Sequence, residues 1–206
     1  MITRTYISKF NTIVKEVTDN LDKFELGVAL SKIYDFIWDE FCDWYIELAK
    51  YRIWHAEEDP KAANAALWTL KTVLANGLKM LHPFMPFVSE EIYSALVPEE
   101  ESLMMSKWPE FKAEWNFATE ELQVERMKEI IRGVRNVRAE MNVAPSRKAG
   151  VFVVCENEVL CNGFAEMKTS AAPLMSASEI VIQYTKEGIE EDAVSVVVTD
   201  AVVYLP

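Results

Sequence analysis

The sequence predicts a mainly α fold in which a helical bundle is followed by a small α+β unit. Apolar residues recur at helical spacing over residues 3 to 141, with only short breakers between the segments. After Met141 the pattern changes to β-branched runs separated by glycine and aspartate. We therefore expect a helical domain over residues 1 to 145 and a smaller unit over residues 146 to 206.

The first three helices follow from apolar spacing and from the residues that interrupt it. The first helix is expected from Thr3 to Asp19, where an Asp-Asn turn follows. A long aromatic helix is expected from about Glu25 to Trp54. The third begins near Pro60, because a proline lacks the N–H that would be unpaired in a first helical turn, and it extends to about Leu81.

Two further helices complete the predicted bundle. Ser89 is expected to cap a short fourth helix that ends at Leu96. A polar and aromatic loop follows over about 98 to 117. The fifth helix is expected from Thr119 to Met141, with Thr119 as its N-cap and acidic residues in its first turn.

The smaller unit is predicted from β-branched runs. Strands are expected at Gly150 to Cys155, Ile180 to Ile182, Val194 to Val198 and Val202 to Leu205, with a helix at about 157 to 170. The chain stops at Pro206 without a polar tail, and we expect a longer natural chain to continue beyond it.

The long helix contains the densest aromatic stretch, Asp35 to Lys50. At about 100° per residue, Trp38, Trp44 and Tyr45 fall on one broad apolar face, and the acids occupy the other face. Phe36 is the exception, because this wheel places it in the charged face with nothing to bury it. The apolar face predicts a helix packed between neighbours.

Composition excludes several classes of function. The net charge of −12 argues against binding nucleic acid through the whole surface, so any RNA contact needs a local basic patch. Three cysteines without a CxxC pair fit a reducing cytoplasm, and no apolar run is long enough to span a membrane. His55 and His82 have no partners at metal or nucleophile spacing. We expect no catalytic residue, no metal site and no cofactor in this chain.

A local basic patch is present on the predicted fifth helix. Lys128, Arg132 and Arg135 follow the spacing i, i+4 and i+7, which we interpret as a basic ridge. Asn136 lies on the polar side, and Arg147 and Lys148 extend the cations beyond the helix. Single-stranded RNA is bound by such cations together with aromatic platforms. The alternative is a solvated face with ion pairs, and Arg138 is expected to be buried against a carboxylate.

Three segments together resemble a known family. They are IYDFIWDEFCDWYIELAK at 33 to 50, HPFMPFVSEEIY at 82 to 93 and IRGVRNVRAEMNVAPSRK at 131 to 148. In this order they resemble the C-terminal part of the bacterial valyl-tRNA synthetase family. The resemblance is strong from about residue 6 to 148 and weaker through the strand-rich end.

The resemblance implies a helical-bundle anticodon-binding domain of class I aminoacyl-tRNA synthetases, followed by a small α+β unit that is cut before a coiled coil. It implies tRNA(Val) as the partner and places ATP-dependent valine attachment in a catalytic domain of the same chain that is missing here. The residues expected to contact tRNA are Lys128, Arg132, Arg135, Asn136, Arg147, Lys148 and Phe36.

Two alternatives remain open from the sequence. The chain could be the anticodon-binding domain of another class I synthetase, the isoleucine or leucine enzyme. It could also be a helical protein-interaction module in which Trp44, Tyr45 and Trp54 form the partner surface.

Overall fold

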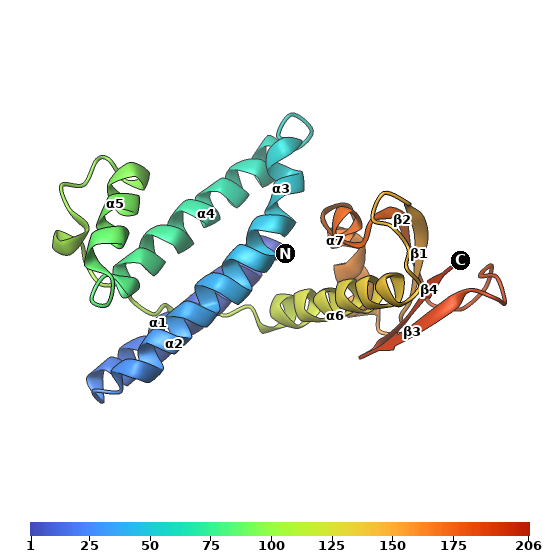
Figure 1. Ribbon diagram of the computed structural model, residues 1–206, viewed down its shortest axis with the longest axis horizontal. Coiled ribbons are helices and arrows are strands. Elements are labelled where there is room, and N and C mark those ends of the chain that lie inside the picture. The colour runs from blue at the N-terminus through green and yellow to red at the C-terminus, as the bar shows by residue number, and fades with distance from the viewer. The chain divides into compact units, whose positions relative to one another are not determined.

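The computed structural model describes residues 1–206 and divides into two compact units. One unit, here called the helical unit, comprises Thr3–Phe117. The other, the sheet unit, comprises Ala118–Pro206 together with Met1–Ile2. Both are drawn in Figure 1. The mainly α fold with a small α+β unit, predicted from the sequence, is confirmed.

The helical unit contains the predicted helices with altered ends. Its elements are α1 (Ile2–Asp22), α2 (Leu26–Asp35), η1 (Phe36–Ile46), α3 (Glu47–Trp54), α4 (Pro60–Leu81), α5 (Pro86–Leu96), η2 (Leu103–Met105) and η3 (Ala113–Trp115). The first helix passes the expected stop at Asp19, and the turn comes at Phe24, whose φ of 60° is left-handed. Asp59 caps α4 as its side chain accepts from Ala62 N–H at 3.0 Å.

The aromatic stretch is helical throughout, but its middle is a π-helix rather than an α-helix. Residues Phe36–Ile46 form this eleven-residue segment between α2 and α3. A π-helix bonds i to i+5, so residues five apart come close to sharing a face. Phe36 continues the buried stripe of α2, since it lies three residues after the buried Ile33, and the π register then brings Phe41 close to the same face; each ring is 3% exposed. The α-helical wheel used for the sequence was wrong at this point.

The buried face of η1 packs against α1 and α4. The rings of Phe36 and Phe10 lie 5.6 Å apart, and those of Tyr45 and Tyr6 lie 4.7 Å apart. The Tyr45 hydroxyl donates to the carbonyl of Ala66 in α4 at 3.1 Å. These contacts explain why Tyr45 has no exposed surface. The expected packing of this helix between neighbours is confirmed.

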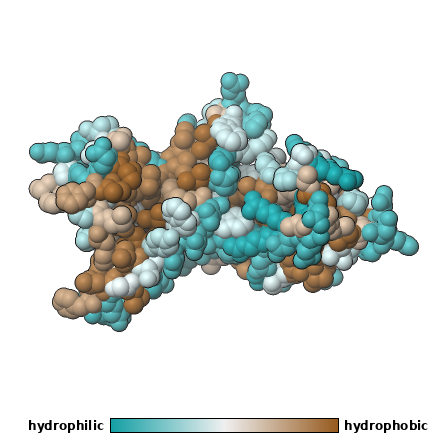
Figure 2. Space-filling model, in the orientation of Figure 1, coloured by the Kyte–Doolittle hydropathy of each residue, from teal (hydrophilic) through white to brown (hydrophobic).

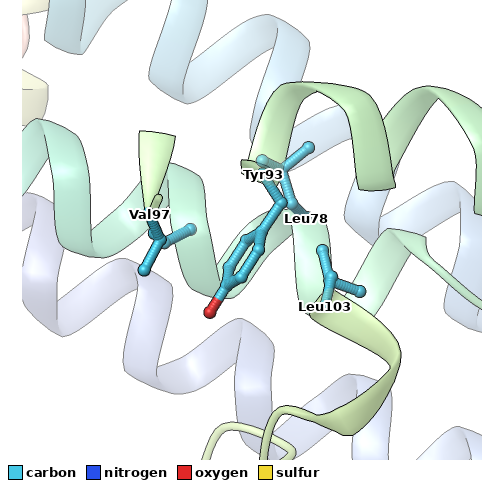
Figure 3. Close-up of a cluster of buried hydrophobic side chains, with 5 residues drawn as sticks. Leu78, Tyr93, Val97 and Leu103 are labelled. Carbon is cyan, nitrogen blue, oxygen red and sulfur yellow. The ribbon is translucent and has the colours of Figure 1, made fainter. Parts of the chain in front are cut away.

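A second cluster holds α5 and η2 against the end of α4. Figure 3 shows the ring of Tyr93 flanked by Val97 and Leu103, and Leu78 belongs to the same cluster. The helix α5 begins at Pro86, so Ser89 is not its N-cap. Ser89 is instead buried and its hydroxyl donates to the carbonyl of Met85 at 2.7 Å.

The sheet unit is built from α6 (Ala118–Glu140), β1 (Ala149–Val154), α7 (Glu158–Met175), β2 (Ala177–Gln183), β3 (Val194–Val198) and β4 (Ala201–Leu205). The strand order is β2-β1-β4-β3. The β1–β2 pair is parallel, with α7 as the crossover, and the pairs involving β4 are antiparallel. All four predicted strands are present. Thr119 lies inside α6 rather than at its cap.

The helix α6 packs directly on the sheet. A Cβ added to Gly133 would lie 2.8 Å from Val196 Cγ1 of β3, so glycine permits this approach. The carboxylate of Glu129 accepts from Thr199 N–H, and Asp200 accepts from Arg126 Nε at 2.8 Å, which ties α6 to the β3–β4 turn. The compact division therefore falls after Phe117, so that α6 belongs to the sheet unit. The predicted domain boundary at residue 145 stays a prediction.

The surface of the helical unit is not uniformly polar. Figure 2 shows apolar side chains gathered over α4 and α5 on the visible face. Exposed members of α5 and its start are Met85, Phe87, Val88 and Ile92. None of the helices combines the length and the apolar character needed to cross a membrane.

Candidate nucleic-acid interface

The candidate interface is built where α6 ends and the chain turns back toward the sheet. Asn142 adopts a left-handed φ of 53°, and Val143 N–H donates to the carbonyl of Arg138 at 2.8 Å. An asparagine tolerates this conformation, which closes the helix and starts the segment leading to β1. The cations at 147 and 148 lie on this returning segment.

Arg138 holds the returning segment in place. Its side chain is 8% exposed, and its Nη2 atom donates to the carbonyls of Ala144 at 3.1 Å and Arg147 at 2.5 Å. The predicted burial of Arg138 is confirmed. The predicted carboxylate partner is wrong, because backbone carbonyls take the guanidinium hydrogens instead. A fixed loop backbone is thereby presented at the surface next to α6.

Five of the predicted contact residues are exposed in this region. They are Arg132, Arg135, Asn136, Arg147 and Lys148, here called the basic end of α6. Residues 132 to 148 contain five cationic side chains and one acid, which gives a local charge of +4 in a chain with a net charge of −12. Cations and amides of this kind contact phosphates and base edges. The region is thus the local basic patch that nucleic-acid binding by an acidic protein requires.

Arg135 also has a structural contact. Its Nε donates to the carbonyl of Leu174 at 2.7 Å, near the C-terminal end of α7. A cation is favourable at that end of a helix because the last carbonyls carry partial negative charge. The arginine therefore links α6 to α7 and still exposes part of its surface.

Lys128 does not belong to the basic end of α6. Its side chain is 1% exposed, and its Nζ lies 3.0 Å from the carboxylate of Glu125. The reason is visible in the spacing, since Val124 and Ile131 at i−4 and i+3 are both fully buried. The predicted ridge thus loses its first member, which shares the apolar face of the helix.

Phe36 is not brought to this region either. It lies in the helical unit, is 3% exposed and packs on Phe10, so its ring has no face available for a base. The prediction that it projects from the charged face was wrong, because Phe36 continues the buried stripe that Ala29 and Ile33 form on α2.

Two grooves of the sheet unit flank Arg138. One, of about 470 Å³, is lined by Arg135, Pro173 and Ser176 among others. The other, of about 400 Å³, is lined by Arg147, Lys148 and Asp192 among others. Arg138 contributes to both. These grooves combine α6 with segments far away in sequence, and no sequence pattern marks where they meet.

The other residues considered from the sequence have structural positions. His82 Nδ1 lies 2.8 Å from Ser89 Oγ, and His55 Nδ1 lies 2.8 Å from the carbonyl of Tyr51. Trp44 and Tyr45 are buried at 7% and 0% exposure, while Trp54 is 73% exposed. The partner surface proposed for a protein-interaction module therefore retains only one of its three aromatic residues.

Comparison with known proteins decides the family. The model of the anticodon-binding domain of tRNA ligases matches residues 3–153, which include the whole helical unit, α6 and most of β1. The chain belongs to this family of anticodon-binding domains. The anticodon-binding domain defined by the match thus contains the basic end of α6.

Curated relatives of this anticodon-binding domain are valine-tRNA ligases. The protein of Clostridium tetani is 45% identical over 200 residues, that of Clostridium perfringens 43% over 203, and that of Clostridium acetobutylicum 42% over 203. These alignments cover 97%, 97% and 98% of this chain. The chain spans 22% to 23% of the length of these relatives.

Proposed function

We propose that this chain is the tRNA-binding part of a valine-tRNA ligase and that it binds the anticodon arm of tRNA(Val) in the cytoplasm. The observation that carries this proposal is the exposed basic end of α6, with its local charge of +4 inside an anticodon-binding domain. Arginine and lysine side chains would bind phosphates, and Asn136 would offer both a donor and an acceptor to a base edge. The three free cysteines fit a reducing compartment.

The chemistry of the parent enzyme is assigned to the part of its sequence outside this chain. In this proposal the parent attaches valine to tRNA(Val) with ATP, and the chain studied here positions the tRNA. No two of the six glycines lie within ten residues of each other, so there is no glycine-rich phosphate loop. The exposed apolar side chains of α5 supply a surface suited to packing on another domain of that parent.

A salt-dependence experiment tests the proposed interface. Binding of a tRNA(Val) transcript is measured at several salt concentrations for the wild type and for Arg147→Ala combined with Lys148→Ala. Each lost phosphate contact should flatten the slope of log K against log salt by about one unit. Lys168→Ala is the control, because it removes an exposed cation from α7 of the same unit. An unchanged slope in the double variant would exclude these cations from the interface.

The proposed preference for tRNA(Val) is tested by competition between tRNAs. We expect unlabelled tRNA(Val) to displace labelled tRNA(Val) at lower concentration than tRNA(Ile) or tRNA(Leu) does. The relatives at 42% to 45% identity support this preference, because their names specify valine. More effective displacement by the isoleucine or leucine tRNA would assign the chain to one of the other class I synthetases.

A further inference from the structure

The helix α4 differs in charge from every other α-helix of the chain. Its 22 residues include Lys61, Lys71 and Lys79 and no aspartate or glutamate, whereas each of the other α-helices contains at least one acid. Lys61 and Lys71 lie seven residues before and three residues after Trp68, so all three share one face. In a chain with a net charge of −12, this face is suited to a polyanion.

Trp68 forms an exposed aromatic pair on this face. Its side chain is 53% exposed, and its ring contacts the ring of Trp115 with centroids 6.5 Å apart and planes at 85°. In such an edge-to-face pair, one of the two rings keeps both of its faces clear of the other. The exposed indole of Trp68, paired with a second ring, thus offers aromatic surface whose burial by a ligand would be favourable.

A cation stands beside the pair. The ammonium of Lys112 lies 4.1 Å from the centroid of the Trp115 ring, which is within cation–π distance. Aromatic faces next to lysine or arginine are the combination with which proteins bind unpaired nucleotides. Lys71 of α4 meets Glu99 at 3.1 Å through side chains that are 50% and 62% exposed. A phosphate could replace such an exposed carboxylate, because surface ion pairs are weak.

The loop that carries Lys112 and Trp115 is fixed by buried polar residues. Asn11, 2% exposed, donates to the Lys112 carbonyl and accepts from the Lys112 N–H, both at 2.8 Å. Ser8, 1% exposed, accepts from Phe117 N–H at 2.8 Å. Burying a polar side chain costs free energy unless it is hydrogen-bonded. Here the hydrogen bonds of the buried Asn11 and Ser8 fix one backbone conformation of the surface loop. The aromatic pair is therefore held in position before any ligand arrives.

We propose that Trp68, Trp115 and Lys112 form a stacking platform for an unpaired base of bound RNA, with Lys61 and Lys71 close to the flanking phosphates. The inference rests on the proposed tRNA-binding function and adds a second contact surface, located in the helical unit. The ligand class is single-stranded RNA, as in a tRNA loop. Stacking tolerates any base, so this platform contributes affinity rather than sequence choice.

The test compares Trp68→Ala, Trp68→Phe and Lys112→Ala with the wild-type chain. Binding is measured with a tRNA(Val) transcript, with a non-cognate tRNA and with a seven-nucleotide single-stranded RNA. Loss of one stacked base should weaken binding of both cognate tRNA and the short RNA roughly 5- to 150-fold in Trp68→Ala. Trp68→Phe should retain most of the affinity because a stacking face remains. Trp54→Ala is the matched control, since Trp54 is 73% exposed on α3, and circular dichroism checks folding.

The outcomes separate the platform from the proposed function. If tRNA(Val) is preferred but Trp68→Ala binds it as the wild type does, the platform is overturned and the proposed function stands. If Trp68→Ala weakens the short RNA while cognate and non-cognate tRNAs bind alike, the platform stands and the valine assignment fails. Absence of binding to every RNA overturns both. If Trp68→Ala changes only self-association, the pair is a protein contact and the platform is overturned.

Discussion

The contact between α6 and β3 predicts how Gly133→Ala changes the stability of the sheet unit. The change should be destabilising when Val196 is present and stabilising when Val196 is replaced by alanine. In Gly133→Ala the new methyl would stand 2.8 Å from Val196 Cγ1 and 3.4 Å from Val198 Cγ1. The first distance is below van der Waals contact, and valine has a stiff side chain that cannot swing away cheaply. Either the helix or the strand must shift.

Two opposing effects set the magnitude. Alanine favours a helix interior over glycine by about 1 kcal/mol. Overpacking a well-filled contact costs about 1 to 3 kcal/mol. Gly133→Ala should therefore destabilise the sheet unit by about 0 to 2 kcal/mol, despite its better helix propensity. When Val196→Ala removes the blocking methyl groups, the same Gly133→Ala change should become stabilising by up to about 1 kcal/mol.

The stabilities of the two units can be measured separately, because all tryptophans lie in the helical unit. All six tryptophans lie between residues 38 and 115, so their fluorescence follows unfolding of the helical unit alone. Urea unfolding of the sheet unit is followed by hydrogen exchange of peptides covering β3 and β4. A double-mutant cycle gives the coupling between positions 133 and 196. Equal effects of Gly133→Ala on stability with and without Val196 would refute the steric argument. A loss of stability seen only in tryptophan fluorescence would place the effect in the helical unit and also contradict it.

Three further predictions concern the interface and the bundle. Arg138→Met removes the buried guanidinium and leaves the carbonyls of Ala144 and Arg147 without its hydrogen bonds. The free energy of unfolding of the sheet unit in urea should therefore fall by about 2 to 4 kcal/mol, and tRNA binding should weaken. Normal affinity in a folded variant would show that loop position is unimportant. Phe36→Ala should lower the stability of the helical unit by about 3 to 5 kcal/mol, measured by tryptophan fluorescence, and an effect below about 1 kcal/mol would mean that the ring is exposed. The N–H of Leu103, which donates to the Glu90 carboxylate, is the main cause that lowers the pKa of Glu90 below its ordinary value of 4.5. The ionised carboxylate therefore stabilises the fold above pH 4.5, and this stabilisation is lost as the pH falls through the lowered pKa. Denaturation midpoints of Glu90→Gln and the wild type should therefore differ at neutral pH and converge in acid, and a difference that grows in acid would contradict the assignment.

The helices and strands were predictable because their signals are local. Periodic apolar residues marked the helices, and runs such as Val194–Val198 marked the strands. The ends were less predictable, because capping depends on which polar side chain is free to turn inward. Ser89 reads as a cap in the sequence, yet Pro86 starts the helix and Ser89 bonds within it.

The candidate interface was predictable only in part, because helical registers decide which side chains are exposed. Phe36 could have been placed inward, since it lies seven residues after Ala29 and three after Ile33, both buried in α2. The π-helix changes the register only after Phe36, and no propensity in the sequence indicates a π-helix. Lys128 could have been excluded, since Val124 and Ile131 place it on the apolar face. Long-range contacts such as Lys112 with Asn11 had no sequence signal, because they join segments about one hundred residues apart.

Recognition of the anticodon by this chain is tested most directly by comparing two versions of one tRNA that differ only in the anticodon loop. The chain is titrated with a tRNA(Val) transcript and with the same transcript carrying a different anticodon loop, at one low salt concentration. Base contacts worth about 1 to 3 kcal/mol predict roughly 5- to 150-fold weaker binding of the altered transcript. Equal affinities for the two transcripts would contradict recognition of the anticodon by this chain.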